Sequence, residues 1–390
     1  MDKIYMDHIA GAPMLPEVFD AMVPYFKENF GNPSSIHSAG EEAENAITEA
    51  REKVASLIGA LGQNIIFTSC GTESNNLALK GVALAYKNKG NHVIMSPIEH
   101  FSNMHGAKAL AKLGFDVTML SVDGHGMIDP DEVREAIKPE TILVSIIHAN
   151  PEVGTIQDLS EIGKVTKEAD VVFHTDAVCL VGAIPVDVDE LNVDLLSLAA
   201  NMFYGPKGAA ALYVRKGVRL EPLLDGGIQE RGKRAGTENV PAIVGMGVAA
   251  EIAGKEMESR IKHVTTLRDR LIKELPEKMG DTLLLGHPQK RLPGNVSIAV
   301  NYIEGESMLL FLDMEGIQVA SGSACISRSL KVSHVMLAMG IDHAVAQGSV
   351  LMTLGKDNTN QDVDKVIATL PPIVQRLRDM SPLYHKKKNQ

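Results

Sequence analysis

The chain has 390 residues, of which 45% are hydrophobic, so it is long enough for two domains with substantial cores. Its formal net charge of −11 argues against a nucleic-acid partner, because proteins that bind nucleic acids neutralise phosphates with clustered basic residues. No apolar run is long enough to span a membrane and no cleavable signal is recognisable, so we expect a cytoplasmic protein without a membrane partner.

The first part of the chain predicts an extended segment, a helical run over 15–30 and a long amphipathic helix over 40–58. A strand, a turn of small residues and a helix follow over 64–79. The backbone N–H groups at the start of that helix, together with the Thr72 hydroxyl, can form an anion site. Ordinary helix capping by Thr72 is the alternative.

Further strands follow at 92–95, 141–147 and 169–176, and each ends in polar residues. Strands that alternate with helices in this way predict an α/β fold with a mainly parallel sheet and helices on both faces. The second strand of this group is followed by Pro151, and the third ends at Asp176.

A further apolar run, VDLLSLAA, precedes the glycine-containing turn YGPKG at 204–208. Ligands of open α/β sheets bind at the carboxyl ends of the strands, so Asp176 and residues 199–204 are expected to face one crevice. An aspartate there can pair with a protonated pyridine nitrogen and keep the ring electron-poor. The alternative is a helix N-cap.

A long charged helix over 249–279 predicts a solvent-facing connector, with a domain boundary near Gly254. We therefore expect a large cofactor-binding domain over 14–254. Residues 1–13 and 255–390 are expected to form a smaller α+β domain.

Three cysteines, Cys70, Cys179 and Cys325, are too few and too widely spaced for a disulfide framework or a CxxC metal site. Cys70 and Cys179 are interpreted as packing residues, because no His or acid accompanies them at ligand spacing. Cys325 lies among small and polar residues, and Arg328 nearby favours its thiolate, which predicts a reactive thiol on a mobile surface loop. A small buried hydrophobe is the alternative interpretation of Cys325.

From end to end, the chain resembles the NifS/IscS-type cysteine desulfurases, which are class V, fold-type I enzymes that use pyridoxal 5'-phosphate. Seven separate stretches in the same order carry the resemblance. They are FGNPSSIHSAG (30–40), TSCGTESNN (68–76), SPIEH (96–100), HTDA (174–177), YGPKG (204–208), ERGKRAGTEN (230–239) and SGSACISRSL (321–330).

The resemblance implies roles for individual residues. His100 would stack on the pyridine ring and move protons, and Thr237 would reach the cofactor phosphate of a neighbouring subunit, which implies a homodimer. Asn32 matches a residue that helps to hold the substrate carboxylate, although an Asx turn before Pro33 explains it equally well. The implied cofactor-binding residues are Gly71, Thr72, His100, Asn150, Asp176 and Thr237.

The chain departs from the family pattern where the reaction takes place. Met202 stands where the family lysine binds the cofactor covalently, and a thioether can neither form that bond nor carry a proton as an amine does. Lys207 lies five residues further on and does not replace it. Leu351 stands where an arginine grips the substrate carboxylate. Three further cofactor contacts of the family are replaced, by Cys179, Pro151 and Ala199.

Cys325 matches the family cysteine that takes up sulfur as a persulfide and delivers it to an iron–sulfur scaffold protein of the IscU type. Three roles remain open for it: accepting sulfur from L-cysteine or another donor, acting as a thiolate ligand to a 2Fe–2S cluster shared with the scaffold, or being idle. Cys325 and His100 are therefore the candidate catalytic residues, and Cys325 is the candidate metal ligand.

Our first hypothesis is a homodimeric family member that acts in iron–sulfur assembly, binds pyridoxal phosphate weakly and noncovalently or not at all, and has little or no desulfurase activity. The second is an active desulfurase in which the cofactor and cysteine combine without a lysine and His100 moves the proton. The third is a purely structural partner in the assembly complex.

Overall fold

The computed structural model describes residues 3–322 and 332–388, and for residues 386–388 it describes the backbone only. Cys325 and Arg328 therefore lie outside the described residues. No helix in the described part of the chain combines the length and apolar character that crossing a membrane requires.

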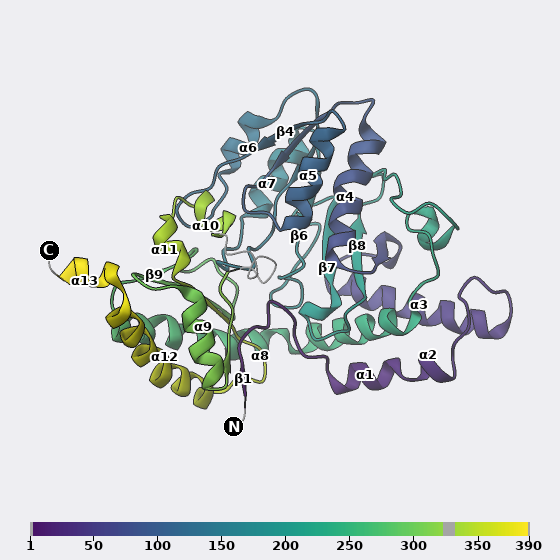
Figure 1. Ribbon diagram of the computed structural model, residues 1–390. Helices are drawn as coiled ribbons and strands as arrows, with labels where there is room; N and C mark the ends of the chain where they lie inside the picture. Colours follow the sequence, from purple (N-terminus) through teal and green to yellow (C-terminus); the bar gives the residue numbers. More distant parts are fainter. Residues whose placement is uncertain (1–2, 323–331, 389–390) are drawn as a thin grey trace.

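A seven-stranded sheet forms the centre of the larger domain (Figure 1). Its strands lie in the order β2-β8-β7-β6-β5-β3-β4, and every neighbouring pair from β7 to β4 is parallel, whereas β8 is antiparallel to both of its neighbours. The predicted α/β fold with a mainly parallel sheet is confirmed. The strands are β2 (Ile65–Thr68), β3 (His92–Met95), β4 (Asp116–Met119), β5 (Thr141–Ser145), β6 (Val172–Asp176), β7 (Leu195–Ala199) and β8 (Ala210–Val214).

Both faces of this sheet are covered by helices, which explains why its central strands are buried throughout and mostly apolar. One face packs on α4 (Gly71–Tyr86) and α5 (Phe101–Lys112) through residues such as Leu79 and Leu110. The other face packs on the remaining helices of the domain and on the first half of α8 (Val240–Met279). Those helices are α1 (Pro16–Met22), α2 (Pro24–Lys27), α3 (Ser38–Ser56), α6 (Pro130–Ala136) and α7 (Leu159–Glu168).

The smaller domain is built on an antiparallel sheet of three strands in the order β12-β10-β9. The N-terminal strand β1 adds a parallel pair with β11, so the beginning of the chain packs with its last third. Its strands are β1 (Ile4–Tyr5), β9 (Thr282–Leu284), β10 (Asn295–Val300), β11 (Ile317–Gln318) and β12 (Ser349–Thr353). Its helices are α9 (Gly305–Met314), α10 (His334–Ala338), α11 (His343–Gln347), α12 (Asn360–Met380) and α13 (Pro382–Lys388).

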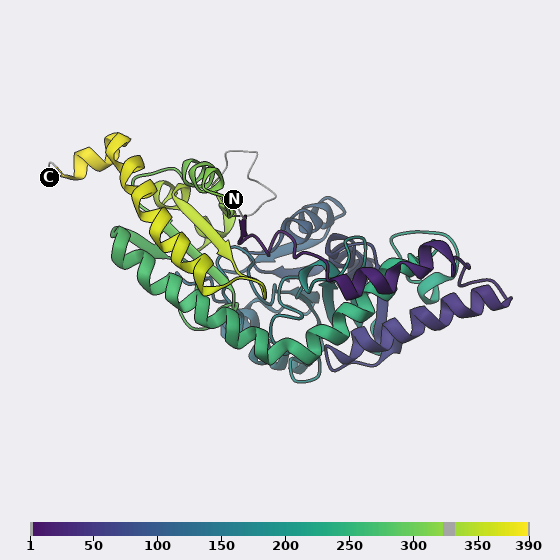
Figure 2. The same ribbon diagram turned by 90° about the horizontal axis from the view of Figure 1, so that it is seen from below.

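One helix connects the two domains. Helix α8 runs beneath both of them (Figure 2). It begins nine residues before the expected start at 249 and ends at the expected residue, 279. Its first half, up to Ala253, belongs to the core of the larger domain, and its second half, from Val264, belongs to the core of the smaller one. The boundary near Gly254 thus falls within a continuous helix, and the exact domain limits stay a prediction.

The order of the strands places chemistry-bearing residues at one edge of the sheet. Strands β6 and β7 are parallel neighbours, with Asp176 opposite Ser197, so their carboxyl ends meet. A short 3-10 helix, η2 (Ala200–Met202), follows β7 directly. Asp176 and Met202 therefore face the same crevice, as expected for an open α/β sheet.

A buried ion pair anchors the loop that carries Thr237. Glu230, in the short 3-10 helix η3 (Gln229–Gly232), accepts two hydrogen bonds from the Arg51 guanidinium at 2.6 and 2.7 Å, and a third from the backbone N–H of Phe67. Only 2% of the Glu230 side chain and 12% of the Arg51 side chain are exposed. The pair therefore fixes a glycine-rich loop to α3 and β2 with little contact with solvent.

We expect Arg51→Met to lower the free energy of unfolding by about 3–5 kcal/mol, because it leaves a buried carboxylate without its counter-charge. Urea denaturation followed by circular dichroism measures this loss. Arg134→Met is the matched control, since the Arg134–Glu168 pair is largely exposed and its removal should cost less than about 1 kcal/mol. Equal losses in the two variants would contradict the anchoring role of Glu230.

Candidate active site

A cavity of about 280 Å³ lies at the carboxyl ends of β5, β6 and β7, between the two domains. Its wall combines the N-terminal segment, the start of α4, the polar ends of the sheet strands and β12. The lining residues used below are Asp7, Ile9, Cys70, Gly71, Thr72, Asn75, His100, Pro151, Glu152, Asp176, Cys179, Ala199, Asn201, Met202, Gly322 and Leu351.

Asp176 is held in the cavity wall by two hydrogen bonds. Its Oδ1 accepts from the backbone N–H of Val178 at 3.0 Å, and its Oδ2 accepts from the Asn75 amide at 2.6 Å. Burial raises the pKa of this carboxyl above its ordinary value, while His100 and these two hydrogen bonds oppose the rise. No helix follows β6 directly, so Asp176 is not the N-cap that the sequence left open.

His100 is the N-cap residue of α5, and its Nδ1 lies 2.7 Å from the Ser102 hydroxyl. The same hydroxyl accepts a hydrogen bond from the Asn75 amide at 2.9 Å. Asn75 therefore links the His100–Ser102 pair to Asp176, and the four side chains form one polar network. Sequence reasoning identified His100 and Asp176 but not Asn75 and Ser102, because a helical Asn and Ser give no distinguishing signal.

The start of α4 offers backbone N–H groups to the cavity at Gly71 and Thr72. The N-cap side chain, the exposed thiol of Cys70, makes no capping hydrogen bond with this helix. A Cβ atom on Gly71 would come within 2.6 Å of the Val178 side chain, so glycine is required where these two segments meet. This end of the cavity suits an anionic group.

No lysine lines the cavity among the residues that the structure describes. Met202 lies in the wall beyond β7, and its sulfur accepts a hydrogen bond from the Asn201 amide at 3.4 Å. Lys207 is exposed and does not line the cavity. The covalent attachment point that the resemblance requires is therefore missing from the described wall.

The other substituted positions also lie in this wall. Leu351, on β12, presents an aliphatic side chain where the resemblance expects an arginine. The Cys179 thiol donates to the backbone oxygen of Ala149 at 2.9 Å, and burial raises its pKa, so it is not a reactive thiolate. Ala199 and Pro151 provide no side-chain donor.

Two acids in the wall, buried Glu152 and half-buried Asp7, were not predicted from the sequence. Glu152 has both carboxylate oxygens buried without a well-formed hydrogen bond, and Asp7 has one such oxygen. Burial raises the pKa of Glu152 to about 7, against an opposing contact from Ser333, and raises that of Asp7 to about 6. Glu152 lies under Gly322, whose Cβ would come within 3.0 Å of its Oε1. An acid in a turn gives no sequence signal for such burial.

The structure places the remaining candidates as follows. Asn150 is buried, but its amide closes the turn to Glu152 and Val153 and does not line the cavity. Thr237 is exposed and away from the cavity of its own chain. The roles implied for both stay predictions. Asn32 caps an Asx turn through the Ser34 N–H. Within the described residues, no group of three His, Cys, Asp or Glu side chains has the arrangement of a metal site.

Residues 4–366 match the model of the family described as Aminotransferase class-V. The chain is 51% identical over 380 residues to cysteine desulfurase IscS of Dictyoglomus turgidum, covering 97% of this chain and 96% of that protein. It is 52% identical over 384 residues to cysteine desulfurase IscS of Methanosarcina thermophila, covering 98% and 95%. The chain belongs to the IscS/NifS-type cysteine desulfurases. A solved structure named NIFS-like protein superposes with a TM-score of 0.90 at 37% identity, covering 96% of this chain and all of that one.

Pyridoxal phosphate is the cofactor of this family. The described cavity fits the cofactor in two respects, since the start of α4 suits its phosphate and buried Asp176 suits its ring nitrogen. It does not fit a covalent link, because the wall carries a thioether and no amine. When bound, the cofactor acts as an electron sink; Asp176, Gly71, Thr72 and His100 would hold it.

We expect the Glu152→Gln variant to lose part of the pH dependence of folding stability. The folded chain keeps a proton on Glu152 up to about pH 7, whereas the unfolded chain releases it near the ordinary value of 4.5. The free energy of unfolding therefore falls as the pH rises through this window, by about 3 kcal/mol.

Urea denaturation of both proteins at pH 5 and pH 8 measures the difference. The wild type should lose more stability than Glu152→Gln on going to pH 8, where the variant should be the more stable of the two. Identical pH dependence in both proteins would show that Glu152 is solvated or paired.

Proposed function

We propose that this chain is a homodimeric IscS/NifS-type protein of iron–sulfur cluster assembly that holds pyridoxal phosphate noncovalently and has little or no cysteine desulfurase activity of its own. The observation that carries the proposal is the cavity wall beyond β7, where Met202 stands and no described lysine is present. Its cytoplasmic location stays a prediction.

The loss of activity follows from what the missing groups do. An amine beyond β7 would form the covalent link and move the α-proton of the substrate, and removing such a group typically costs several powers of ten in rate. A cation at Leu351 would hold the substrate carboxylate, which a leucine cannot do. His100 is the described side chain best placed to move a proton, since it lines the cavity and contacts the network that holds Asp176.

Large exposed apolar side chains support the dimer. Phe26, Phe30 and Ile36, on α2 and the segment after it, are largely or fully exposed, and so is Ile228 in the loop before Thr237. Apolar surface of this extent is typical of protein–protein interfaces. Burial against a second copy would bring the Thr237 loop to an interface, as the resemblance implies.

The role of Cys325 rests on the sequence, since this residue lies outside the described part of the chain. We propose that its thiol receives sulfur from a donor or ligates a cluster being assembled on an IscU-type scaffold. The proposal is supported by Gly322, the last described residue before that segment, which lines the cofactor cavity.

The absorption spectrum of the protein with added pyridoxal phosphate tests the cofactor half of the proposal. We expect the spectrum of the free aldehyde, removable by dialysis, and no band of a lysine-bound cofactor, because no lysine lines the described part of the wall. Met202→Lys combined with Leu351→Arg should produce that band. If the double variant fails to produce it, the pocket has changed beyond these two positions.

Sulfide release from L-cysteine tests the catalytic half. We expect negligible release from the wild type with added cofactor and measurable release from the Met202→Lys, Leu351→Arg variant. Robust wild-type turnover that vanishes in Cys325→Ser would reject the proposal in favour of an active desulfurase. In reconstitution with a scaffold protein, an unchanged cluster yield with Cys325→Ala would instead indicate a purely structural role.

A further inference from the structure

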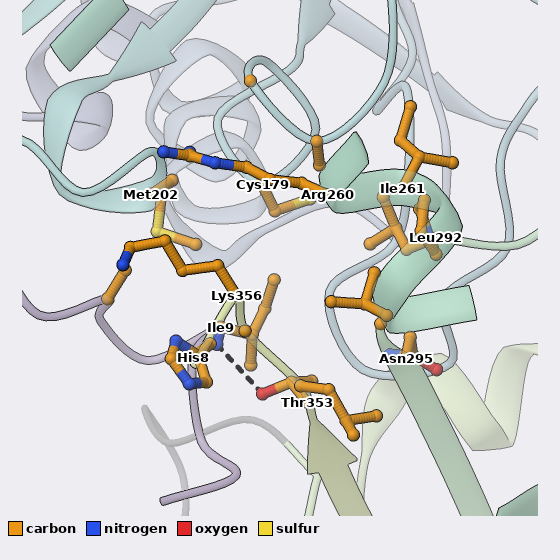
Figure 3. A pocket seen from close by; sticks show the side chains of 18 of the residues that line it. His8, Ile9, Cys179, Met202, Arg260, Ile261, Leu292, Asn295, Thr353 and Lys356 are labelled. Carbon is orange, nitrogen blue, oxygen red and sulfur yellow. Dashed lines mark hydrogen bonds between the residues drawn. The ribbon is translucent and has the colours of Figure 1, made fainter. Parts of the chain in front are cut away.

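A second pocket, of about 100 Å³, lies between the two domains next to the cofactor cavity; we call it the hinge pocket. One side is formed by the N-terminal segment and the η2 region of the larger domain, and the other by α8, the start of β10 and the end of β12. Figure 3 shows its labelled lining residues, which are His8, Ile9, Cys179, Met202, Arg260, Ile261, Leu292, Asn295, Thr353 and Lys356.

Two cations line the hinge pocket. Arg260 extends from α8 and Lys356 from the segment after β12, and both reach toward the end of the pocket where Met202 lies (Figure 3). Their charged groups lie 4.8 and 5.9 Å from the ring centre of Tyr204, which also lines the pocket. Each cation pairs with an acid outside the pocket, Arg260 with Glu256 and Lys356 with Asp357.

These pairs leave donors unused. The Nη1 of Arg260 is buried and has no hydrogen-bond partner in the described structure, and only 11% of this side chain is exposed. The Nδ1 of His8 is likewise buried without a partner. A buried guanidinium donor is ordinarily satisfied by an acceptor, so its isolation beside a cavity indicates a place for a ligand oxygen.

The two adjoining cavities have opposite charge. Among the described residues the hinge pocket is lined by two cations and no acid, whereas the cofactor cavity is lined by Asp7, Glu152 and Asp176 and by no lysine or arginine. The two cavities adjoin, because Ile9, Cys179 and Met202 line both of them.

The N-terminal segment separates the two environments. Asp7 lines the cofactor cavity, His8 lines the hinge pocket and Ile9 lines both. The chain turns here, since the backbone N–H of Ala10 donates to the oxygen of Asp7 at 3.1 Å, and this turn presents an acid to one cavity and an imidazole to the other.

We propose that the hinge pocket binds the carboxylate of a small α-amino acid, with Arg260 and Lys356 as its recognition groups and the ligand's ammonium directed to the neighbouring acid-lined cavity. A carboxylate is the group that an unused guanidinium donor and an ammonium bind best. An amino acid carries both charges a short distance apart, and the two cavities adjoin, since Ile9, Cys179 and Met202 line both. The pocket thus supplies a carboxylate site that Leu351 no longer provides, and it does so whether or not a cofactor is bound.

Ligand-observed NMR on the full-length protein without cofactor tests this proposal with three matched probes. L-alanine has both charged groups, propionate lacks the amine and ethylamine lacks the carboxylate. We expect L-alanine to bind in the millimolar range, propionate more weakly and ethylamine not detectably. Ethylamine binding as tightly as L-alanine, or no binding of L-alanine, would overturn the proposal.

Variants locate the site. Arg260→Met should weaken L-alanine binding on the order of tenfold or more, since it keeps the aliphatic stem and removes the charge. Lys356→Met removes the second cation, on a different element, and should weaken binding in the same direction. Lys262→Met is the control, because Lys262 is exposed on the same helix and does not line the pocket. Thermal melting confirms folding, and unchanged binding in both pocket variants would exclude the hinge pocket as the site.

Discussion

The side chain that follows β7 decides what this protein can do. At the carboxyl end of a buried parallel sheet, beside a carboxylate held by Asn75, the chain presents the thioether of Met202. A thioether neither bonds covalently to an aldehyde nor accepts a proton at neutral pH. The surrounding architecture, including the helix start at Gly71 and the polar network of His100, is that of a cofactor site, but its reactive amine is missing from the described wall.

Charge is distributed unevenly around this point. Three buried or partly buried carboxylates face the cofactor cavity, and burial raises the pKa of each, so the cavity is costly to ionise without a cationic ligand. On the other side of Met202, Arg260 and Lys356 line the hinge pocket, and no acid lines it among the described residues; the acids that pair with these cations lie outside the pocket. The two adjoining cavities between the domains are therefore lined by side chains of opposite charge, which favours a ligand with one charge of each sign.

The fold could be predicted from the sequence because its strongest signals are local. Apolar runs such as VDLLSLAA that end in polar residues indicated buried parallel strands, and the charged run after residue 249 indicated the long connector α8. The start of α8 was predicted too late, since its first half is apolar and buried and so lacks the charge pattern that marked the rest.

The site was only partly predictable. Asp176 ends a strand and His100 follows one, so both could be singled out. Glu152, Arg260 and Lys356 acquire their importance from burial and from contacts between residues far apart in the sequence. No spacing in the chain indicates that Arg260 and Lys356 lie on the same aromatic ring of Tyr204. Only the tertiary structure brings those residues together.

Borohydride reduction after incubation with pyridoxal phosphate, followed by peptide mass mapping, tests the central claim most directly. Reduction fixes any lysine-bound cofactor as a stable pyridoxyl adduct. We expect no stoichiometric adduct on any lysine of the chain, because no described lysine lines the cofactor cavity. One pyridoxyl group per chain on a single lysine, such as Lys207 or Lys356, would contradict it.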